Sequence, residues 1–545
     1  MFKSARLFPL VTYGLFGFLF FHFAKEMLQV RDDGWYVGQV NLYGDLVLHI
    51  SFINKFLETG KVIVDSPIYA GAKPNYPIFA DFITAQIAKI TTIDWALFIT
   101  TFLGGLLVVY IARLFIKNFI RNEKVIFLTL LLFFINGGLG FLYFFQDYAT
   151  TGGSFINFLT NLPNEYTDIK EKGYWWINTY LAYFLPQRGF LFAFPITLTS
   201  LALLYQGTRK AKSLYFLLAG LLSGVLPLVQ AHSLFVIFLL SALYFPSLLV
   251  ISKNKKELAI NWIVFAAVTA ALALPLFKTI SSSDNALSFI RFDPGFTSEE
   301  NIVWFWTKNL GLFAPVLIAA IIWIFKNHKH LFFLYLPFLM LFAASNIFIF
   351  QPWDFDNTKI LIYWYFASSV LVAYFIYEEF LSQNVLKKAI GSTIVTVMIL
   401  SGAIDIVRTF TPPTNYRIFA GKDLEVAQAV KNLTAKDSLF VTASNHNHPI
   451  PTLTGRSTLL GFHGWVWSHG LDYQERQEDI KKIYQGGKTS SQLIAKYRVS
   501  YVTIGPHERS EFAPNENYFG QFPQIYIARD WSLYDVGYLW SNSNR

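Results

Sequence analysis

Asp45 and His49 have the residue types and the spacing of a pair that can move a proton or bind a metal ion. Apolar residues recur around them at helical spacing, which predicts an amphipathic helix over residues 45–58. Positions i and i+4 share one helix face, so the carboxylate and the imidazole would lie side by side. Such a pair can take a proton from a hydroxyl group or bind a divalent cation. Alternatively, Asp45 only caps the helix, a position that favours Asp.

A second acidic group, Asp32 and Asp33, precedes this helix. It competes with Asp45 for the same role, although adjacent acidic residues on a loop are more often only solvated. We therefore take Asp45, His49 and Asp33 as candidate catalytic residues.

Three basic side chains stand at the ends of apolar segments. Arg188 and Lys359 each begin or directly precede one, where a lipid-linked phosphate would lie, and both can bind phosphate. Alternatively, they are interfacial anchors whose charged ends reach for water. His232 stands at another helix end, either as a substrate ligand or as a packing residue.

The segment 351–359, QPWDFDNTK, is the densest polar cluster between two apolar segments. The spacing of Asp354 and Asp356 could hold a divalent cation, Mg²⁺ or Mn²⁺, that bridges phosphate oxygens.

Histidines and tryptophans gather in two segments of the C-terminal region. His446 and His448 belong to NHNHP at 445–449, and residues 461–470 read GFHGWVWSHG. No known zinc spacing is matched. We interpret these segments as an aromatic and hydrogen-bonding surface for a sugar or peptide, with plain loop structure as the alternative.

The composition of the chain indicates that the elements carrying these residues lie in a membrane. Hydrophobic residues make up 54% of the 545 positions and charged residues only 14%, which is too apolar for a soluble protein. The net charge of +9 comes largely from short Lys and Arg clusters between apolar runs. This pattern indicates membrane topology and not nucleic-acid binding. The absence of cysteine excludes disulfides and thiolate chemistry.

About eleven apolar stretches are long enough to span a bilayer. They lie near 7–24, 92–112, 124–144, 188–206, 213–230, 232–251, 258–277, 302–325, 331–350, 360–380 and 389–407. Basic clusters occupy alternate connections, which places the N-terminus in the cytoplasm and the chain after residue 408 outside. The helix at 45–58 would then lie along the outer membrane surface. We read the first run as a retained helix, because no small-residue cleavage site follows it.

From about residue 411 the chain becomes more polar, and helix-like and strand-like segments alternate. We therefore expect a transmembrane domain over 1–410 and a soluble, extracytoplasmic α/β domain over 411–545. Nucleotide-binding, zinc-protease and serine-hydrolase motifs do not occur in the sequence.

This layout resembles the GT-C class of membrane glycosyltransferases, which includes protein mannosyltransferases, aminoarabinose transferases and oligosaccharyltransferase catalytic subunits. The resemblance rests on Gly44-Asp45-x-x-x-His49 in a long first outer loop, on Asn75-Tyr76-Pro77, and on the strand entry at 495–505. The WDxDNTK and NHNHP segments are also similar to uncharacterised bacterial GT-C-like proteins.

The resemblance implies an inverting enzyme that transfers a sugar from a polyprenyl-phosphate donor to an acceptor hydroxyl at the outer membrane face. Asp45 would match the acidic residue of the family's first loop. The acceptor would be a lipid, glycan or protein, and the membrane a bacterial cytoplasmic membrane. The alternatives are a transporter or flippase of a lipid-linked sugar and a non-enzymatic assembly subunit. A transporter would carry ionisable residues in mid-span, and we find none beside Pro195, Pro227 and Pro275.

Overall fold

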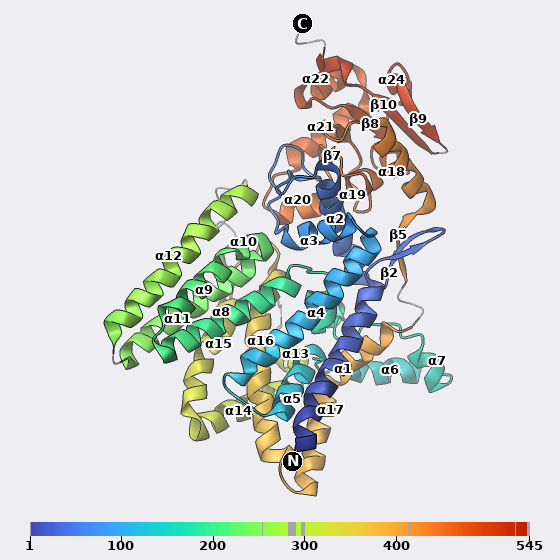
Figure 1. Cartoon of the computed structure of the whole chain (residues 1–545). Coiled ribbons are helices and arrows are strands. Elements are labelled where there is room, and N and C mark those ends of the chain that lie inside the picture. The colour runs from blue at the N-terminus through green and yellow to red at the C-terminus, as the bar shows by residue number, and fades with distance from the viewer. Residues whose placement is uncertain are drawn as a thin grey trace. The chain divides into compact units, whose positions relative to one another are not determined.

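The computed structural model describes residues 2–252, 254–281, 290–295, 300–411, 415–528 and 530–541 (Figure 1). The chain forms two compact units. The helical unit comprises Met1–Lys25, Thr101–Leu276 and Leu287–Asn415, and the mixed unit comprises Glu26–Thr100, Phe277–Ala286 and Tyr416–Arg545. The first long loop thus belongs to the same unit as the C-terminal region. Outside the described part lie Lys253, Pro412, Pro413 and the side chains of Lys3 and Arg6.

Within the described residues, eight helices are long and apolar enough to cross a membrane. They are α1 (Phe2–Glu26), α4 (Ile93–Lys117), α8 (Phe190–Lys210), α11 (Ala231–Ile251), α12 (Lys255–Ile280), α15 (Lys329–Ile347), α16 (Thr358–Ile376) and α17 (Val385–Arg408). Short turns η3 (Asp354–Asn357) and η4 (Tyr377–Leu381) extend α16 at its two ends. A bent pair, α13 (Ile302–Leu310) and α14 (Phe313–Asn327), makes a ninth span if counted as one. The protein is therefore a multi-pass membrane protein.

Two of the eleven expected spans are divided into shorter helices in the structure. The stretch 124–144 divides into α5 (Glu123–Phe134) and α6 (Phe141–Thr151). The break follows from Gly137 and Gly402, whose backbones approach so closely that a Cβ on Gly137 would lie 2.7 Å from the Gly402 nitrogen. The stretch 213–230 divides into α9 (Ser213–Gly224) and α10 (Leu226–Val229), with Pro227 at the start of the second helix. Figure 1 shows α8 to α12 as neighbouring helices.

The segment between α6 and α8 contains only α7 (Phe155–Leu159), η1 (Lys170–Lys172) and the π-helical turn η2 (Tyr180–Phe184). Asp405 of α17, fully buried, holds this segment in place. Its carboxylate accepts hydrogen bonds from the backbone nitrogens of Tyr166 (2.5 Å) and Thr167 (2.8 Å). A two-stranded ribbon of β3 (Arg291–Phe292) and β4 (Phe348–Ile349) completes the helical unit.

The mixed unit begins with the hairpin of β1 (Gln29–Arg31) and β2 (Gly34–Val37), and β5 (Tyr416–Ala420) pairs antiparallel with β2. Helices α2 (Val40–Thr59) and α3 (Phe79–Ala88) follow the hairpin and pack against each other. All residues of α2 from Leu46 to Phe56 are buried. The expected helix therefore forms, but it is a core helix of this unit and not one lying on a membrane surface. Because α2 begins at Val40 with Gln39 as its N-cap residue, Asp45 does not cap it.

The C-terminal part of the mixed unit is built around a five-stranded sheet with the order β7-β6-β8-β10-β9. Its strands are β6 (Leu439–Val441), β7 (Ser457–Thr458), β8 (Tyr501–Ile504), β9 (Gln524–Ala528) and β10 (Trp531–Asp535). β6 runs parallel to β7 and β8, and β10 runs antiparallel to β8 and β9. The accompanying helices are α18 (Gly421–Leu433), α19 (Pro449–Leu453), α20 (His463–Ser468), α21 (Gln474–Gln485), α22 (Gly487–Tyr497), α23 (Pro506–Phe512), α24 (Glu516–Phe519) and α25 (Tyr538–Ser541). Val430, Phe440 and Leu533 form part of the core between helix and sheet.

Candidate active site

A buried histidine–aspartate pair joins the first two helices of the mixed unit. His49 Nδ1 on α2 lies 2.9 Å and 3.0 Å from the two carboxylate oxygens of Asp81 on α3. The side chains are 2% and 0% exposed. An ionised carboxylate only accepts hydrogen bonds, so it fixes a proton on Nδ1 and leaves Nε2 as the nitrogen that can take up another. This is the arrangement of an oriented general base.

Tyr76 faces the other side of the imidazole. Its hydroxyl lies 3.4 Å from His49 Nε2. Its ring stacks on the ring of His469 with centroids 4.9 Å apart and on that of Phe52 at 6.1 Å. The amide of Asn75 donates to the His469 carbonyl at 3.1 Å, which also ties the connector to the C-terminal region. The proline-rich connector is thus an ordered wall beside His49.

Asp45 lies on α2 one helical turn before His49, at the expected spacing. Asp45 is partly buried, whereas His49 is buried. Asp33 lies elsewhere in the mixed unit, in the exposed turn between β1 and β2. There its carboxylate accepts a hydrogen bond from the Tyr36 hydroxyl at 2.5 Å, and its carbonyl accepts one from the Gly421 nitrogen at 2.9 Å. These contacts stabilise the hairpin turn and connect it to the start of α18.

Arg188 lies in the turn before α8 and is completely buried in the helical unit. Its Nη1 donates to the hydroxyl of Thr101 on α4 at 3.3 Å. An interfacial anchor keeps its charged end in water, so this burial does not fit the anchor interpretation. A buried guanidinium presents a positive charge that suits a phosphate ligand, so Arg188 stays a candidate phosphate contact.

His232, Asp356 and Lys359 come together in the helical unit. Lys359 Nζ lies 2.9 Å from Asp356 Oδ2, and both are within electrostatic range of the His232 ring. Among the described residues, neither ring nitrogen of His232 has a hydrogen-bond partner. Buried ring nitrogens favour a polar partner, so this cluster stays our second candidate phosphate contact.

The expected cation site at Asp354 and Asp356 has basic side chains beside both carboxylates. Asp354 pairs with Arg291 and Asp356 with Lys359, so each carboxylate faces a basic side chain. Within the described ranges, no three His, Asp or Glu side chains gather as a metal-ligand group. A shared divalent cation would have to displace both basic side chains, and it stays a prediction.

The C-terminal histidines have different surroundings. His446 stacks on Tyr43 of α2 with ring centroids 5.8 Å apart and contacts Trp465 at 4.5 Å, so the two aromatic segments do meet. His448 is buried, accepts from the Ile450 nitrogen as the cap of α19, and lies 2.7 Å from Glu508. Burial opposes ionisation of Glu508, but His448 and backbone donors hold the pKa of Glu508 below its usual range. His448 is thus part of the core, whereas His446 borders a partly exposed aromatic cluster.

Asp81 and Tyr76 are the site residues that the sequence analysis did not select. The available signals were a charged residue inside the apolar segment 78–90 and the Asn-Tyr-Pro turn before it. A carboxylate in such a segment requires a partner, but sequence spacing does not reveal that His49 is this partner.

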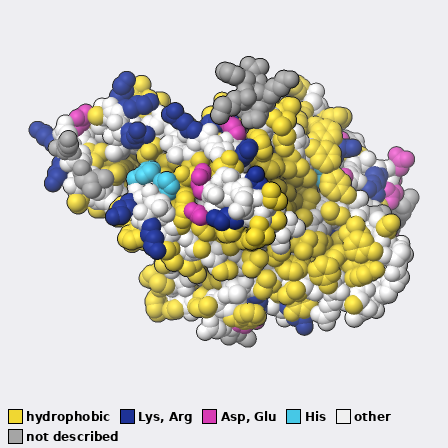
Figure 2. Space-filling model, turned by 90° about the horizontal axis from the view of Figure 1, so that it is seen from below, with side chains coloured by type: hydrophobic (Ala, Val, Ile, Leu, Met, Phe, Trp, Pro, Cys, Tyr) yellow, Lys and Arg dark blue, Asp and Glu magenta, His cyan; other side chains and the backbone are white. Residues whose placement is uncertain are grey.

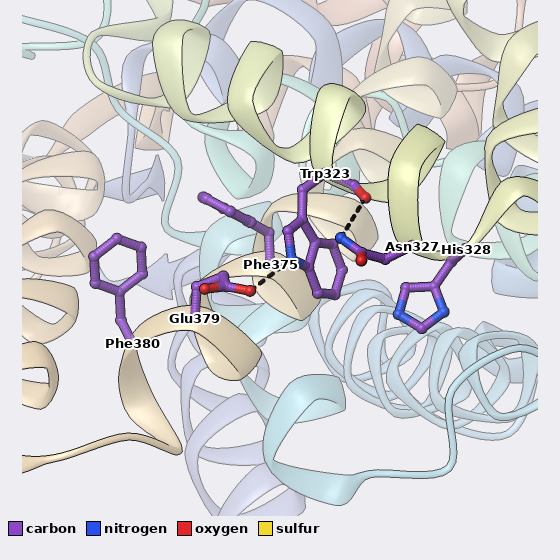
Figure 3. A pocket seen from close by; sticks show the side chains of 6 residues that line it. All are labelled: Trp323, Asn327, His328, Phe375, Glu379 and Phe380. Atoms are coloured by element: carbon purple, nitrogen blue, oxygen red, sulfur yellow. Dashed lines mark hydrogen bonds between the residues drawn. The ribbon is translucent and has the colours of Figure 1, made fainter.

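A cavity of about 580 Å³ in the helical unit contains none of the candidate residues. Trp323, Asn327, His328, Phe375, Glu379 and Phe380 line it (Figure 3). Trp323 Nε1 donates to Glu379 Oε1 at 2.6 Å. The one charged side chain that lines it is acidic, which makes the cavity unsuitable for a phosphate.

No protein-family model and no curated protein matches the sequence. Solved structures do match the fold. The Archaeoglobus fulgidus oligosaccharyltransferase, tethered to an acceptor peptide with an NVT sequon, aligns with a TM-score of 0.56 and 11% identity over 92% of this chain and 69% of that one. ArnT from Cupriavidus metallidurans in the apo state aligns with a TM-score of 0.54 and 11% identity over 98% and 99% of the two chains.

The same ArnT bound to undecaprenyl phosphate aligns with a TM-score of 0.51 and 11% identity over 98% of both chains. The chain has the GT-C fold. The resemblance expected from the sequence is therefore confirmed at the level of the fold. The GT-C fold hosts its chemistry in individual sites, so the activity has to be argued from the residues described above.

Proposed function

We propose that this protein is a glycosyltransferase that moves a sugar from a polyprenyl-phosphate donor to an acceptor hydroxyl at the extracytoplasmic membrane face. The observation that carries the proposal is the buried His49–Asp81 pair, with the Tyr76 hydroxyl near Nε2 of the imidazole. The undecaprenyl phosphate in the similar ArnT structure and the acceptor peptide in the oligosaccharyltransferase structure support this substrate class.

In the proposed reaction His49 Nε2 removes the proton of the acceptor hydroxyl, and Asp81 stabilises the imidazolium that results. The acceptor oxygen attacks the anomeric carbon from the face opposite the phosphate, which inverts the configuration. The bond from this carbon to the phosphate oxygen breaks, and the polyprenyl phosphate leaves with the electron pair. Asp45 is the second candidate base, since it lies one helical turn from His49.

Arg188, His232 and Lys359 of the helical unit are the proposed phosphate contacts. Cationic side chains favour the extra negative charge that the phosphate gains when the bond breaks. No step of this proposal uses a metal ion, and a divalent cation at Asp354 and Asp356 is a separate prediction.

The test uses purified protein in lipid vesicles with a panel of polyprenyl-phosphate sugars and follows consumption of each donor. We expect wild type to consume one donor, Asp45→Asn and His49→Gln to lose most of this activity, and Asp32→Asn, altered in the exposed hairpin turn, to keep it. Equal consumption by wild type and both site variants would remove the assignment. Uptake of a lipid-linked sugar without consumption would show a transporter instead.

A further inference from the structure

A groove of about 620 Å³ lies between α4 and α8, two helices of the same unit. Its walls are mostly apolar along the bodies of the helices. They include Ile111, Leu114, Phe115, Leu198, Ala202 and Leu203. Where both helices end, the lining becomes basic, with Lys117, Arg121, Arg209 and Lys210. The groove thus has an apolar body and a positively charged end.

The charge at this end is largely uncompensated. Lys117 pairs with Glu123 at 2.6 Å. Arg209 donates only to the Tyr205 hydroxyl, and Lys210 to the side chains of Gln206 and Tyr215. Within the described part of the chain, Arg121, Arg209 and Lys210 form no ion pair with a carboxylate. Figure 2, which shows the molecule from below, has Lys and Arg side chains gathered beside an extensive hydrophobic surface.

The floor of the groove is an ordered structure. Gln206 Nε2 of α8 donates to Asn118 Oδ1 at 2.7 Å and so bridges the two helices just before their basic ends. A second cavity of about 160 Å³, almost entirely apolar, lies deeper in the bundle and shares Phe115, Tyr205 and Arg209 with the groove. The two cavities therefore lie on either side of shared side chains.

We propose that this groove binds an anionic phospholipid of the membrane leaflet that faces the basic clusters, the cytoplasmic leaflet by the sequence argument. Its phosphate lies among Arg121, Arg209 and Lys210, and an acyl chain follows the apolar walls. Basic pockets between membrane helices suit such head groups, because charge and apolar contact add together. A free phosphate ion would use only the charged end. The site is independent of the proposed transferase activity.

The experiment measures retention of phosphatidylglycerol and phosphatidylcholine with the same acyl chains by native mass spectrometry of the full-length protein in detergent. We expect the anionic lipid to bind more tightly. Arg121→Gln with Arg209→Gln should weaken its binding about 30-fold, since each basic residue near a lipid phosphate contributes on the order of 1 kcal/mol. The matched control is Lys387→Gln with Lys388→Gln, exposed residues of α17 outside the groove.

A second variant tests the apolar body. Ala202→Trp fills the groove and should lower retention of the anionic lipid while leaving all basic side chains in place. Equal binding of the two lipids, or equal loss in the Arg and Lys double variants, would overturn the proposal. Displacement of the lipid by millimolar inorganic phosphate would also overturn it, because that result marks a simple anion site. Thermal unfolding of every variant verifies that loss of binding is not loss of the fold.

Discussion

His49 Nδ1 lies 2.9 Å from Asp81 Oδ1, although the two residues belong to separate helices and both are almost fully excluded from water. If this contact orients a general base, Asp81→Asn should lower kcat for donor consumption about 100-fold or more, because an amide no longer stabilises the imidazolium. KM should change little. The measurement is steady-state kinetics of donor consumption over a range of donor concentrations, which separates kcat from KM.

Asp437→Asn is the control for this variant. It also changes an aspartate to asparagine in the mixed unit, but in an exposed turn between α18 and β6. Equal losses in both variants would indicate a general effect on folding and would remove Asp81 from the mechanism.

Tyr76 combines a hydroxyl near His49 with a ring that stacks on His469. Tyr76→Phe keeps the ring, so we expect a loss of activity of less than about tenfold, of the size of one hydrogen bond. Tyr76→Ala also removes the stacking and should lower activity much further. If the Phe variant is as inactive as the Ala variant, the hydroxyl itself takes part in proton transfer.

Arg456 connects α2 to the C-terminal part of the mixed unit. Its buried guanidinium lies 2.8 Å from Glu58 Oε2 and donates to the carbonyls of Thr434 and Thr454. Arg456→Met should lower the free energy of unfolding by about 3 to 5 kcal/mol, because it leaves buried acceptors without donors. Arg509→Met, which breaks an exposed pair with Glu516, should cost about 1 kcal/mol or less. Denaturant unfolding in detergent measures both, and similar values would contradict the central role of Arg456.

Glu165 should make the stability of the helical unit depend on pH. Burial raises the pKa of Glu165 to about 7 from 4.5, against the opposing charge of Arg408. Between these two values Glu165 keeps a proton in the folded chain that it has released in the unfolded chain. Its contribution to stability therefore decreases as pH rises and levels off above about pH 7. The decrease is on the order of 3 kcal/mol. Unfolding midpoints from pH 4 to 8 should decrease in wild type and in Glu171→Gln, an exposed control, and should decrease less steeply in Glu165→Gln.

A divalent cation at Asp354 and Asp356 is tested separately. Because both carboxylates face basic side chains, we expect EDTA to leave donor consumption within about twofold of the untreated value. Restoration of a lost activity by Mg²⁺ or Mn²⁺ in wild type, but not in Asp356→Asn, would instead establish the cation.

Many of the membrane-spanning helices could be predicted from the sequence, because the length and apolar composition of a span can be read from its own residues. Eight of the expected spans have a matching long helix. The predictions failed where distant backbone decides the conformation, as at Gly137, which needs the close approach of Gly402 from α17. At Gly311, a positive φ of 56° between α13 and α14 likewise accompanies the 97° bend of an apparently continuous segment.

The candidate site shows the same division. The helical spacing of Asp45 and His49 follows from the local sequence, and the structure places both on α2. The pairing of His49 with Asp81 depends on how α3 packs on α2. The connector between these two helices forms hydrogen bonds with the C-terminal region, which local sequence does not reveal. The burial of Arg188 depends on tertiary packing as well, since its position before an apolar segment is equally typical of an exposed anchor.

The pairing of β2 with β5 sets the order of events during biosynthesis. Val37 and Tyr416 are neighbours in one sheet although 379 residues (416 minus 37) separate them. At about 5 to 20 residues per second, the ribosome needs roughly 20 to 75 seconds to make the intervening chain. The hairpin and α2 must wait through this interval without their final partners while the membrane helices insert. A chain truncated before residue 416 would therefore never complete the unit that carries His49.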